Sequence, residues 1–171
     1  MGSVRFLVQV VPCGPDEMYG PDGADRVEFL LSTNAGEPLK QISRVASGGE
    51  LSRVMLALKS VLAEVDHVPV LIFDEIDTGV GGAVAATIGK RLRELGRYHQ
   101  VLCITHLPQV ASQAQHHFSV EKLEVKGRTV ATVRLLTGIS REGEIARMLG
   151  GERITAKTRS VAAELIAGTH E

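Results

Sequence analysis

The pattern of apolar and polar positions predicts a chain that alternates between strands and helices. The central apolar run covers residues 68–73 and is too short for a helix of its own. Because charged residues follow it directly, we interpret it as a parallel strand buried on both faces, in the middle of a sheet. A second run over 100–105 predicts a neighbouring parallel strand, and a helix predicted over 83–95 connects the two.

Antiparallel strands are expected before and after this centre. Apolar alternation predicts strands over 4–11 and 26–33, connected by a loop rich in proline and glycine. A hairpin is predicted over 118–136, where two further strands flank a glycine turn. Helices over 142–149 and from Thr155 onward complete the elements of an α/β fold.

Composition limits the size of the fold and the kinds of partner. The 171 residues suit one domain or one lobe of a larger protein, and 44% apolar with 4% aromatic residues implies an aliphatic core. A net charge of −1 argues against a positive electrostatic field over the whole protein that would attract nucleic acid or a membrane surface. No signal peptide or membrane span is expected. Cys13 and Cys103 lie far apart and fit no metal spacing, so cytosolic thiols and a cytoplasmic protein are expected, with a disulfide as the alternative. A row of basic residues is interpreted as a solvated helix face, with a nucleic-acid patch as the alternative: Lys90, Arg91, Arg93 and Arg97.

Two acidic residues, Asp74 and Glu75, follow the central strand at its carboxyl end. In open α/β sheets, ligands bind at that end. A carboxylate placed after four apolar residues is the Walker B arrangement, in which Asp74 would hold Mg²⁺ through its water shell. Glu75 would act as general base toward an attacking water. His106 ends the second parallel strand, so we expect it beside these carboxylates.

A second candidate site is the start of a helix upstream. Ser47, Gly48, Gly49 and Glu50 precede apolar residues at three–four spacing, which continue to Val65. Ser47 and Glu50 have the spacing of a capping box, so one interpretation is that Ser47 is simply an N-cap. The two glycines weaken a helix start, but they leave bare N–H groups that suit an anion such as phosphate.

The phosphate cradle that usually accompanies a Walker B motif is absent from the sequence. The pattern Gly-x-x-x-x-Gly-Lys-Ser/Thr does not occur, and the Gly89-Lys90 pair lies inside a predicted helix. The chain therefore carries the hydrolytic half of a nucleotide site without the half that grips the nucleotide.

In their order along the chain, these motifs resemble the second half of an ABC-type ATPase head. Four motifs in this order are far more specific than any one of them. The matches are Ser47-Gly48-Gly49-Glu50 to the signature motif, Asp74-Glu75 to Walker B, Asp77 to the D-loop and His106 to the switch histidine.

The residues around the motifs are similar to the RecN family of bacterial DNA-repair proteins, relatives of the SMC proteins. The similarity is strongest over 45–59, 73–80 and 105–111. It implies that residues 1–171 form the C-terminal lobe of a P-loop NTPase head, with a mostly parallel central sheet, antiparallel hairpins and flanking helices. An N-terminal lobe with Walker A, and a coiled coil between the lobes, would lie outside this chain.

The resemblance also implies roles and partners. Two heads would pair as a homodimer, with ATP and Mg²⁺ held between the Walker motifs of one head and the signature of the other. Residues 47–50 would contact nucleotide on the opposite head, and Arg53 is a weaker candidate for an interface contact. Asp77 would lie at the seam, and His106 would bind the γ-phosphate on its own side. The intact protein would be a nucleoid-associated ATPase acting on DNA, whereas this lobe alone is expected not to hydrolyse ATP.

Two alternatives remain open. Residues 74–77 also fit the Asp-Glu-x-Asp box of a helicase core, although such a helicase gives no reason for residues 47–50. The other alternative is a metal-dependent hydrolase that uses Asp74, Asp77 and His106, for which tight metal binding without nucleotide would be diagnostic.

Overall fold

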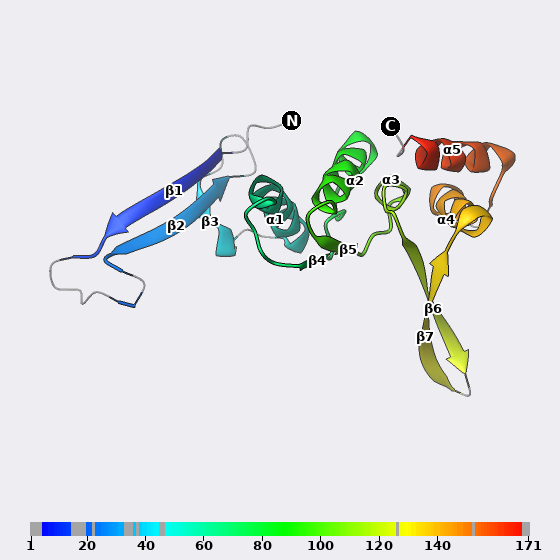
Figure 1. The fold of residues 1–171 in the computed structure, drawn as a ribbon, viewed down its shortest axis with the longest axis horizontal. Coiled ribbons are helices and arrows are strands. Elements are labelled where there is room, and N and C mark those ends of the chain that lie inside the picture. The colour runs from blue at the N-terminus through cyan, green and yellow to red at the C-terminus, as the bar shows by residue number, and fades with distance from the viewer. Residues whose placement is uncertain are drawn as a thin grey trace. The chain divides into compact units, whose positions relative to one another are not determined.

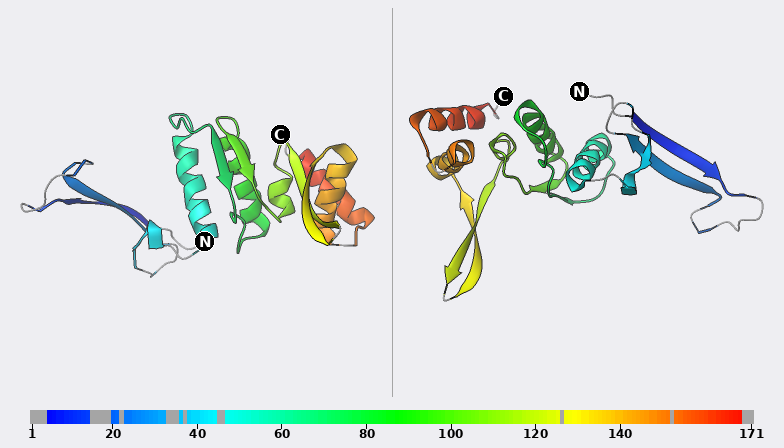
Figure 2. Two further views of the ribbon diagram at one scale, coloured as in Figure 1. Left: turned by 90° about the horizontal axis from the view of Figure 1, so that it is seen from below. Right: turned by 180° about the vertical axis from the view of Figure 1, so that it is seen from behind.

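The computed structural model describes most of the chain, namely residues 5–14, 20–21, 23–32, 36, 38–44, 47–125, 127–151 and 153–168. The chain forms two compact units, residues 1–51 and 52–171, and the boundary falls within helix α1 (Gly48–Leu62). In Figures 1 and 2 the colour runs from blue in the first unit to red at the end of the second.

The first unit is an antiparallel sheet with the order β1-β2-β3. Its strands are β1 (Arg5–Pro12), β2 (Asp25–Ser32) and the two-residue β3 (Lys40–Gln41), and a short 3₁₀ turn (Ile42–Arg44) follows. The register of β1 and β2 runs from Arg5 opposite Ser32 to Pro12 opposite Asp25. Both predicted strands and their antiparallel pairing are confirmed to within one residue. The predicted end residues Val4 and Thr33 lie outside the described residues.

One face of the β1–β2 ladder is apolar. Residues directly opposite in an antiparallel ladder share a face, so the side chains of Phe6, Val8 and Val10 lie on the side of Phe29 and Val27. The rings of Phe6 and Phe29 stack with centroids 6.0 Å apart. These side chains nevertheless stay about half exposed. Leu31 on the same face is buried, but most of this apolar face has no cover among the described residues.

The centre of the second unit is a pair of parallel strands, β4 (Val70–Phe73) and β5 (Gln100–Cys103). Helix α2 (Gly82–Leu95) connects them, as predicted. Helices α1 and α2 lie on the same side of the strands in Figure 1. The strands and both helices share one aliphatic core, formed by Leu56, Ala63, Leu71, Phe73, Ile76, Ala85, Ile88, Leu92, Leu95 and Val110.

The prediction that the central strand is buried on both faces is wrong for this chain. Leu71 and Phe73 point into the core, but Val70 is half exposed and Ile72 is 70% exposed. On β5 and just beyond it, Leu102 and Ile104 are also exposed. The physical reason is that α1 and α2 cover one face, while the described residues include no layer for the other. The apolar run is correct as a strand, and its second face is uncovered.

The remaining elements of the second unit follow the predicted pattern with shifted bounds. They are α3 (Pro108–Ala111), the hairpin β6 (His117–Val125) and β7 (Arg128–Leu136), α4 (Gly138–Gly150) and α5 (Ala156–Ala167). Helix α4 begins earlier than the predicted residue 142, because Thr137 and Ser140 form a capping box there. Thr155 caps α5, in agreement with the predicted start. The hairpin projects away from the helices of this unit (Figure 1).

A smaller second core joins α3, α4 and α5. Ile145 and Ala146 of α4 are fully buried against Ala111 of α3 and Ala162 of α5. Among the described residues, no helix has the length and apolar character needed to cross a bilayer.

Candidate functional site

The carboxyl ends of β4 and β5 meet at one edge of the parallel pair. Phe73 lies opposite Cys103, and the Ile104 N–H donates to the Phe73 carbonyl at 3.0 Å, which extends the ladder past the last paired residues. The residues that follow, 74–77 after β4 and 105–106 after β5, therefore come together. This edge is where the sequence predicted the chemistry.

Asp74 and Glu75 are both exposed at this edge. Glu75 has φ +57°, and it alone among the non-glycine residues of the described chain has a positive φ. The left-handed conformation costs an L-residue about 1–2 kcal/mol. The Glu75 N–H donates to Asp74 Oδ1 at 2.8 Å, which helps to hold this conformation. Strained residues cluster at functional sites, so the geometry singles out the same glutamate as the motif.

Asp77 has the opposite environment, because it is only 2% exposed. Its Oδ2 atom accepts hydrogen bonds from Thr105 Oγ1 at 2.5 Å and from the His106 N–H at 3.0 Å. The same oxygen lies 3.1 Å from His106 Nδ1. Burial would raise the pKa of Asp77, but the hydrogen bonds from Thr105 and His106 outweigh it and lower the pKa below its usual value. Asp77 is therefore an internal carboxylate that holds the segment after β5.

The structure brings His106 to the predicted edge and shows which acid it contacts. The His106 side chain is 73% exposed, and its described contacts run to Asp77, three residues beyond Asp74. The expectation that it lies directly against Asp74 and Glu75 is thus refined to a contact with Asp77. The position of Asp77 at a seam between heads stays a prediction, and its carboxylate points inward.

Two residues of α1 hold the acidic loop through its backbone. Ser52 Oγ donates to the Asp74 carbonyl at 2.8 Å. Arg53 Nη1 donates to the carbonyls of Ile76 and Thr78 at 3.1 and 3.0 Å, on either side of Asp77. The sequence had suggested Arg53 as an interface contact and had not singled out Ser52. In the structure, the Arg53 guanidinium is turned toward its own chain.

Replacing Arg53 with methionine is expected to loosen this loop. The change removes two charge-assisted hydrogen bonds, each worth about 1.5–3 kcal/mol when well shielded and less at this half-exposed site. We expect amide hydrogen exchange at Thr78 and Val80, whose N–H groups bond within the loop, to speed up by about tenfold. Arg91→Met is the matched control, because Arg91 pairs with exposed Glu94 on α2. Unchanged exchange in the Arg53 variant would show that the two bonds do not hold the loop.

Helix α1 begins at Gly48, and Ser47 caps it. The Glu50 N–H donates to Ser47 Oγ at 3.2 Å, and the Leu51 N–H donates to the Ser47 carbonyl at 3.1 Å. The interpretation of Ser47 as an N-cap is confirmed. Ser47 and Gly48 are exposed. By helix geometry, the N–H group of Gly48 points out of the helix start, so capping and anion binding are compatible there, whereas Gly49 is buried.

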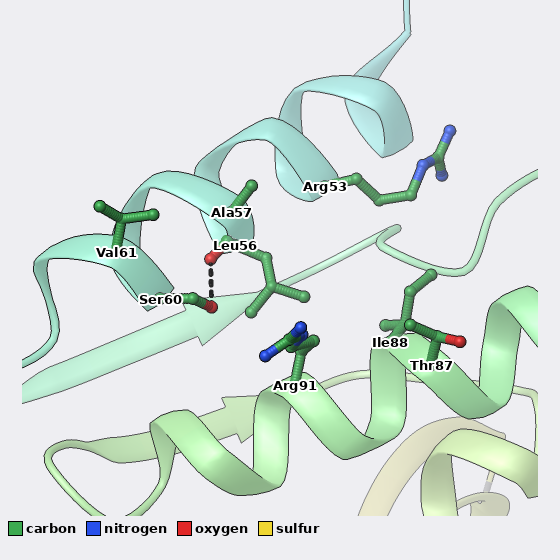
Figure 3. A pocket seen from close by; sticks show the side chains of 8 residues that line it. All are labelled: Arg53, Leu56, Ala57, Ser60, Val61, Thr87, Ile88 and Arg91. Carbon is green, nitrogen blue, oxygen red and sulfur yellow. Dashed lines mark hydrogen bonds between the residues drawn. The ribbon is translucent and has the colours of Figure 1, made fainter. Parts of the chain in front are cut away.

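A groove between α1 and α2 has a volume of about 410 Å³ (Figure 3). Leu56 and Ile88 contribute apolar side chains to it. Arg91 lies at this groove and pairs with Glu94, while the Arg53 guanidinium extends away from Arg91 (Figure 3). Apart from Arg53, none of the predicted site residues lines the groove, so it is separate from the acidic edge.

The donor set at the edge suits a metal held together with a nucleotide. Within the described residues, no group of three or more His, Cys, Asp or Glu side chains is placed to hold a metal ion. Asp77 is turned inward, so it does not join Asp74 and His106 in a closed site. Mg²⁺ typically takes one or two carboxylates together with waters and phosphate oxygens. The exposed Asp74 carboxylate fits that pattern. The alternative of a metal-dependent hydrolase needs Asp74, Asp77 and His106 as common ligands, and these three side chains do not form one site.

The sequence has close curated relatives, although no protein-family model matches it. It is 45% identical over 171 residues to the DNA repair protein RecN of Xylella fastidiosa, covering 100% of this chain. It is 47% identical to the RecN protein of Treponema pallidum, covering 97% of this chain, and 50% identical over 144 residues to that of Bacillus subtilis, covering 84%. The chain spans only 25–30% of the length of these relatives.

Solved structures with a similar fold are heads of Smc proteins. The head domain with coiled coil and joint from Pyrococcus yayanosii matches with a TM-score of 0.56 and 23% identity, over 82% of this chain and 25% of that one. The Smc head with an extended coiled coil from Pyrococcus furiosus, bound to the C-terminal domain of ScpA, matches with a TM-score of 0.53 and 23% identity, over 77% and 31%. At this identity the likeness concerns the fold alone. The chain belongs to the RecN family of DNA repair proteins, and its fold is similar to that of SMC heads.

Proposed function

We propose that residues 1–171 are one half of the ATP-hydrolysing head of a RecN-like DNA-repair protein. The observation that carries the proposal is the single edge that bears Asp74, Glu75 and His106, in a chain whose sequence has no Walker A motif. The lobe supplies Walker B, the D-loop and the switch histidine to the nucleotide on its own head. It supplies the signature motif to the nucleotide on a second head.

The exposed side chains at the edge have distinct tasks in this proposal. ATP with Mg²⁺, when bound, supplies the phosphoryl group to be transferred and the cation that neutralises its charge. Asp74 would hold the cation, and Glu75 orients the attacking water and accepts its proton. His106 hydrogen-bonds the γ-phosphate from its exposed ring. Glu75, with its left-handed backbone, is exposed at the strand end, as this task requires.

The start of α1 acts on the opposite head. Its exposed Ser47 and Gly48, followed by Gly49, offer a helix N-terminus to the γ-phosphate of nucleotide held there. Because each head then needs the signature of the other, two copies of the head pair symmetrically around ATP. Glu50 belongs to this motif and donates its backbone N–H to the cap.

Uncovered apolar surface supports a partner lobe outside this chain. The exposed face of β4–β5, which includes Ile72 and Leu102, and most of the apolar face of β1–β2 have no cover among the described residues. Apolar patches of this kind mark interaction surfaces. The relatives are more than three times as long as this chain. We assign to their additional sequence a Walker A lobe that covers these faces and a coiled coil.

DNA is a partner of the intact protein in this proposal. The support for this partner is the name of the relatives, DNA repair protein. We propose that the intact protein acts at the bacterial nucleoid. Lys90, Arg91 and Arg97 on or next to α2 are exposed, as for a solvated helix face.

Nucleotide binding with and without the remaining lobe tests the proposal. A fluorescent ATP analogue with Mg²⁺ should show no saturable binding to this chain, because the phosphate cradle is missing. The same chain mixed with the N-terminal part of its own protein should bind, and Asp74→Asn should weaken that binding. If the chain alone binds the analogue saturably, and Asp74→Asn weakens that binding, the lobe binds nucleotide by itself. This result would refute the proposal that it is only half of the site.

A further inference from the structure

We infer that the C-terminal half of α2 is a contact surface for the phosphate backbone of double-stranded DNA. The contact is made by three cationic side chains, Lys90, Arg93 and Arg97, which we call the basic stripe. The inference rests on the proposed function, in which DNA is a partner of the intact protein. It adds the part of this lobe that the DNA contacts, and it can be measured without nucleotide.

The first step is the local concentration of positive charge. Residues 90–97 hold four cationic side chains and one carboxylate, a net charge of +3 in a chain whose total net charge is −1. Such a patch attracts phosphates locally, although the protein as a whole carries no positive field. Exposure alone would also suit a solvated helix face, so the partners of these side chains decide between the two interpretations.

The second step is the lack of internal partners for the stripe. The one carboxylate in this stretch, that of Glu94, accepts a hydrogen bond from Arg91 at 2.8 Å. The side chains of Lys90, Arg93 and Arg97 form no hydrogen bond or ion pair with any of the described residues. Acidic residues three or four positions away would normally pair with cations on a helix. The three charges are therefore available to an anion from outside the lobe.

The third step is a further cation next to the stripe. Arg141 of α4 is fixed because its Nη2 atom donates to the carbonyls of Ser112 and Ala114 at 2.9 and 2.6 Å. Burial lowers the pKa of the Arg141 guanidinium, and the nearby charge of Arg93 lowers it further. Two cations held near each other repel, and a phosphate bound beside them relieves that repulsion.

The spacing of the stripe suits one strand of a duplex. Its members are three and four residues apart, so they lie on one side of the helix. Gly96 has φ −64° and ψ −5°, which continues the helical path from the end of α2 to Arg97. At a rise of 1.5 Å per residue the stripe is about 10 Å long, and about three phosphates of one DNA strand cover that length.

Anisotropy of a fluorescent DNA duplex of about 20 base pairs, mixed with this chain, tests the surface. We expect saturable binding at about 50 mM salt, and the logarithm of the binding constant should fall with the logarithm of salt concentration with a slope of about −2.7, as for three phosphate contacts. Duplexes of unrelated sequence should bind equally, because backbone contacts carry no sequence information. Each of Lys90→Gln, Arg93→Gln and Arg97→Gln should reduce the magnitude of the slope by about 0.9, and the triple variant should bind at least about tenfold more weakly.

A second triple variant is the matched control. Arg128→Gln, Lys157→Gln and Arg159→Gln remove the same charge from exposed positions on β7 and α5, so DNA binding should stay within about twofold of that of the unaltered chain. Circular dichroism checks that both triple variants keep the fold.

Equal loss of binding in the two triple variants, or no binding of the duplex by the unaltered chain, would overturn the inference. Binding to phosphatidylglycerol vesicles but not to the duplex would assign the stripe to a membrane surface and would overturn it as well. Absence of ATP hydrolysis by the reconstituted head would count against the proposed function and leave the DNA result standing.

Discussion

Glu75→Gln is expected to lower ATP hydrolysis by about a hundredfold or more in a head that contains both lobes. Glutamine has nearly the same shape as glutamate, but its amide cannot accept the proton of the attacking water. Nucleotide binding and ATP-dependent pairing of heads should persist, because Asp74 and the signature residues are unchanged. Steady-state phosphate release and a sizing measurement with ATP check the two parts separately.

Glu75→Gly distinguishes the role of the Glu75 carboxylate in hydrolysis from the cost of the left-handed backbone at this position. Glycine adopts φ +57° without the penalty that glutamate has, so this variant should be more stable by about 1 kcal/mol. It should be as inactive as Glu75→Gln, because the base is lost. Glu94→Gln on α2 is the control for loss of one exposed carboxylate and should hydrolyse normally. If Glu75→Gln hydrolyses ATP at the unaltered rate, Glu75 is not the base.

Ser47→Arg is expected to abolish hydrolysis by acting on the opposite head. The arginine side chain would occupy the space in front of the exposed helix start, where the nucleotide of the partner should lie. Loss of the cap costs about 1 kcal/mol and should leave the fold intact. Circular dichroism of the variant chain checks the fold, and phosphate release checks the activity.

Mixing two inactive variants tests whether the signature acts across the head pair. In a mixed pair of Ser47→Arg and Glu75→Gln heads, one composite site combines an intact Glu75 with an intact Ser47. An equal mixture should therefore regain about a quarter of the unaltered activity, because about half of the pairs are mixed and one of two sites works. A mixture as inactive as its components would indicate that both residues serve the same head.

The sequence was sufficient for the elements and for the edge where the chemistry lies. Short apolar runs predicted β4 and β5, and the rule that parallel strands end at one edge predicted that the segments carrying Asp74 and His106 meet there, where His106 contacts Asp77. Ser47 was recognisable as a cap because capping depends on residues three apart in sequence. These predictions succeeded because each depends on local spacing or on one topological rule.

Other features depend on contacts that leave no pattern in the sequence. Arg53 binds carbonyls 23 and 25 residues away, and any donor of the right length could do so. Asp77 lies two residues after Glu75, yet it is buried while Glu75 is exposed, because Asp77 bonds to Thr105 and His106, which are 28 and 29 residues away in sequence. Ile72 looks like a core residue in sequence but is exposed, because apolar character does not show whether the covering layer belongs to the same chain.

ATP turnover by the purified chain, alone and with the N-terminal part of its own protein, tests the half-site most directly. Our account predicts background turnover for the chain alone and a clear gain on addition of the second part, which Glu75→Gln removes. Turnover by the chain alone that disappears in the Glu75→Gln variant would contradict it.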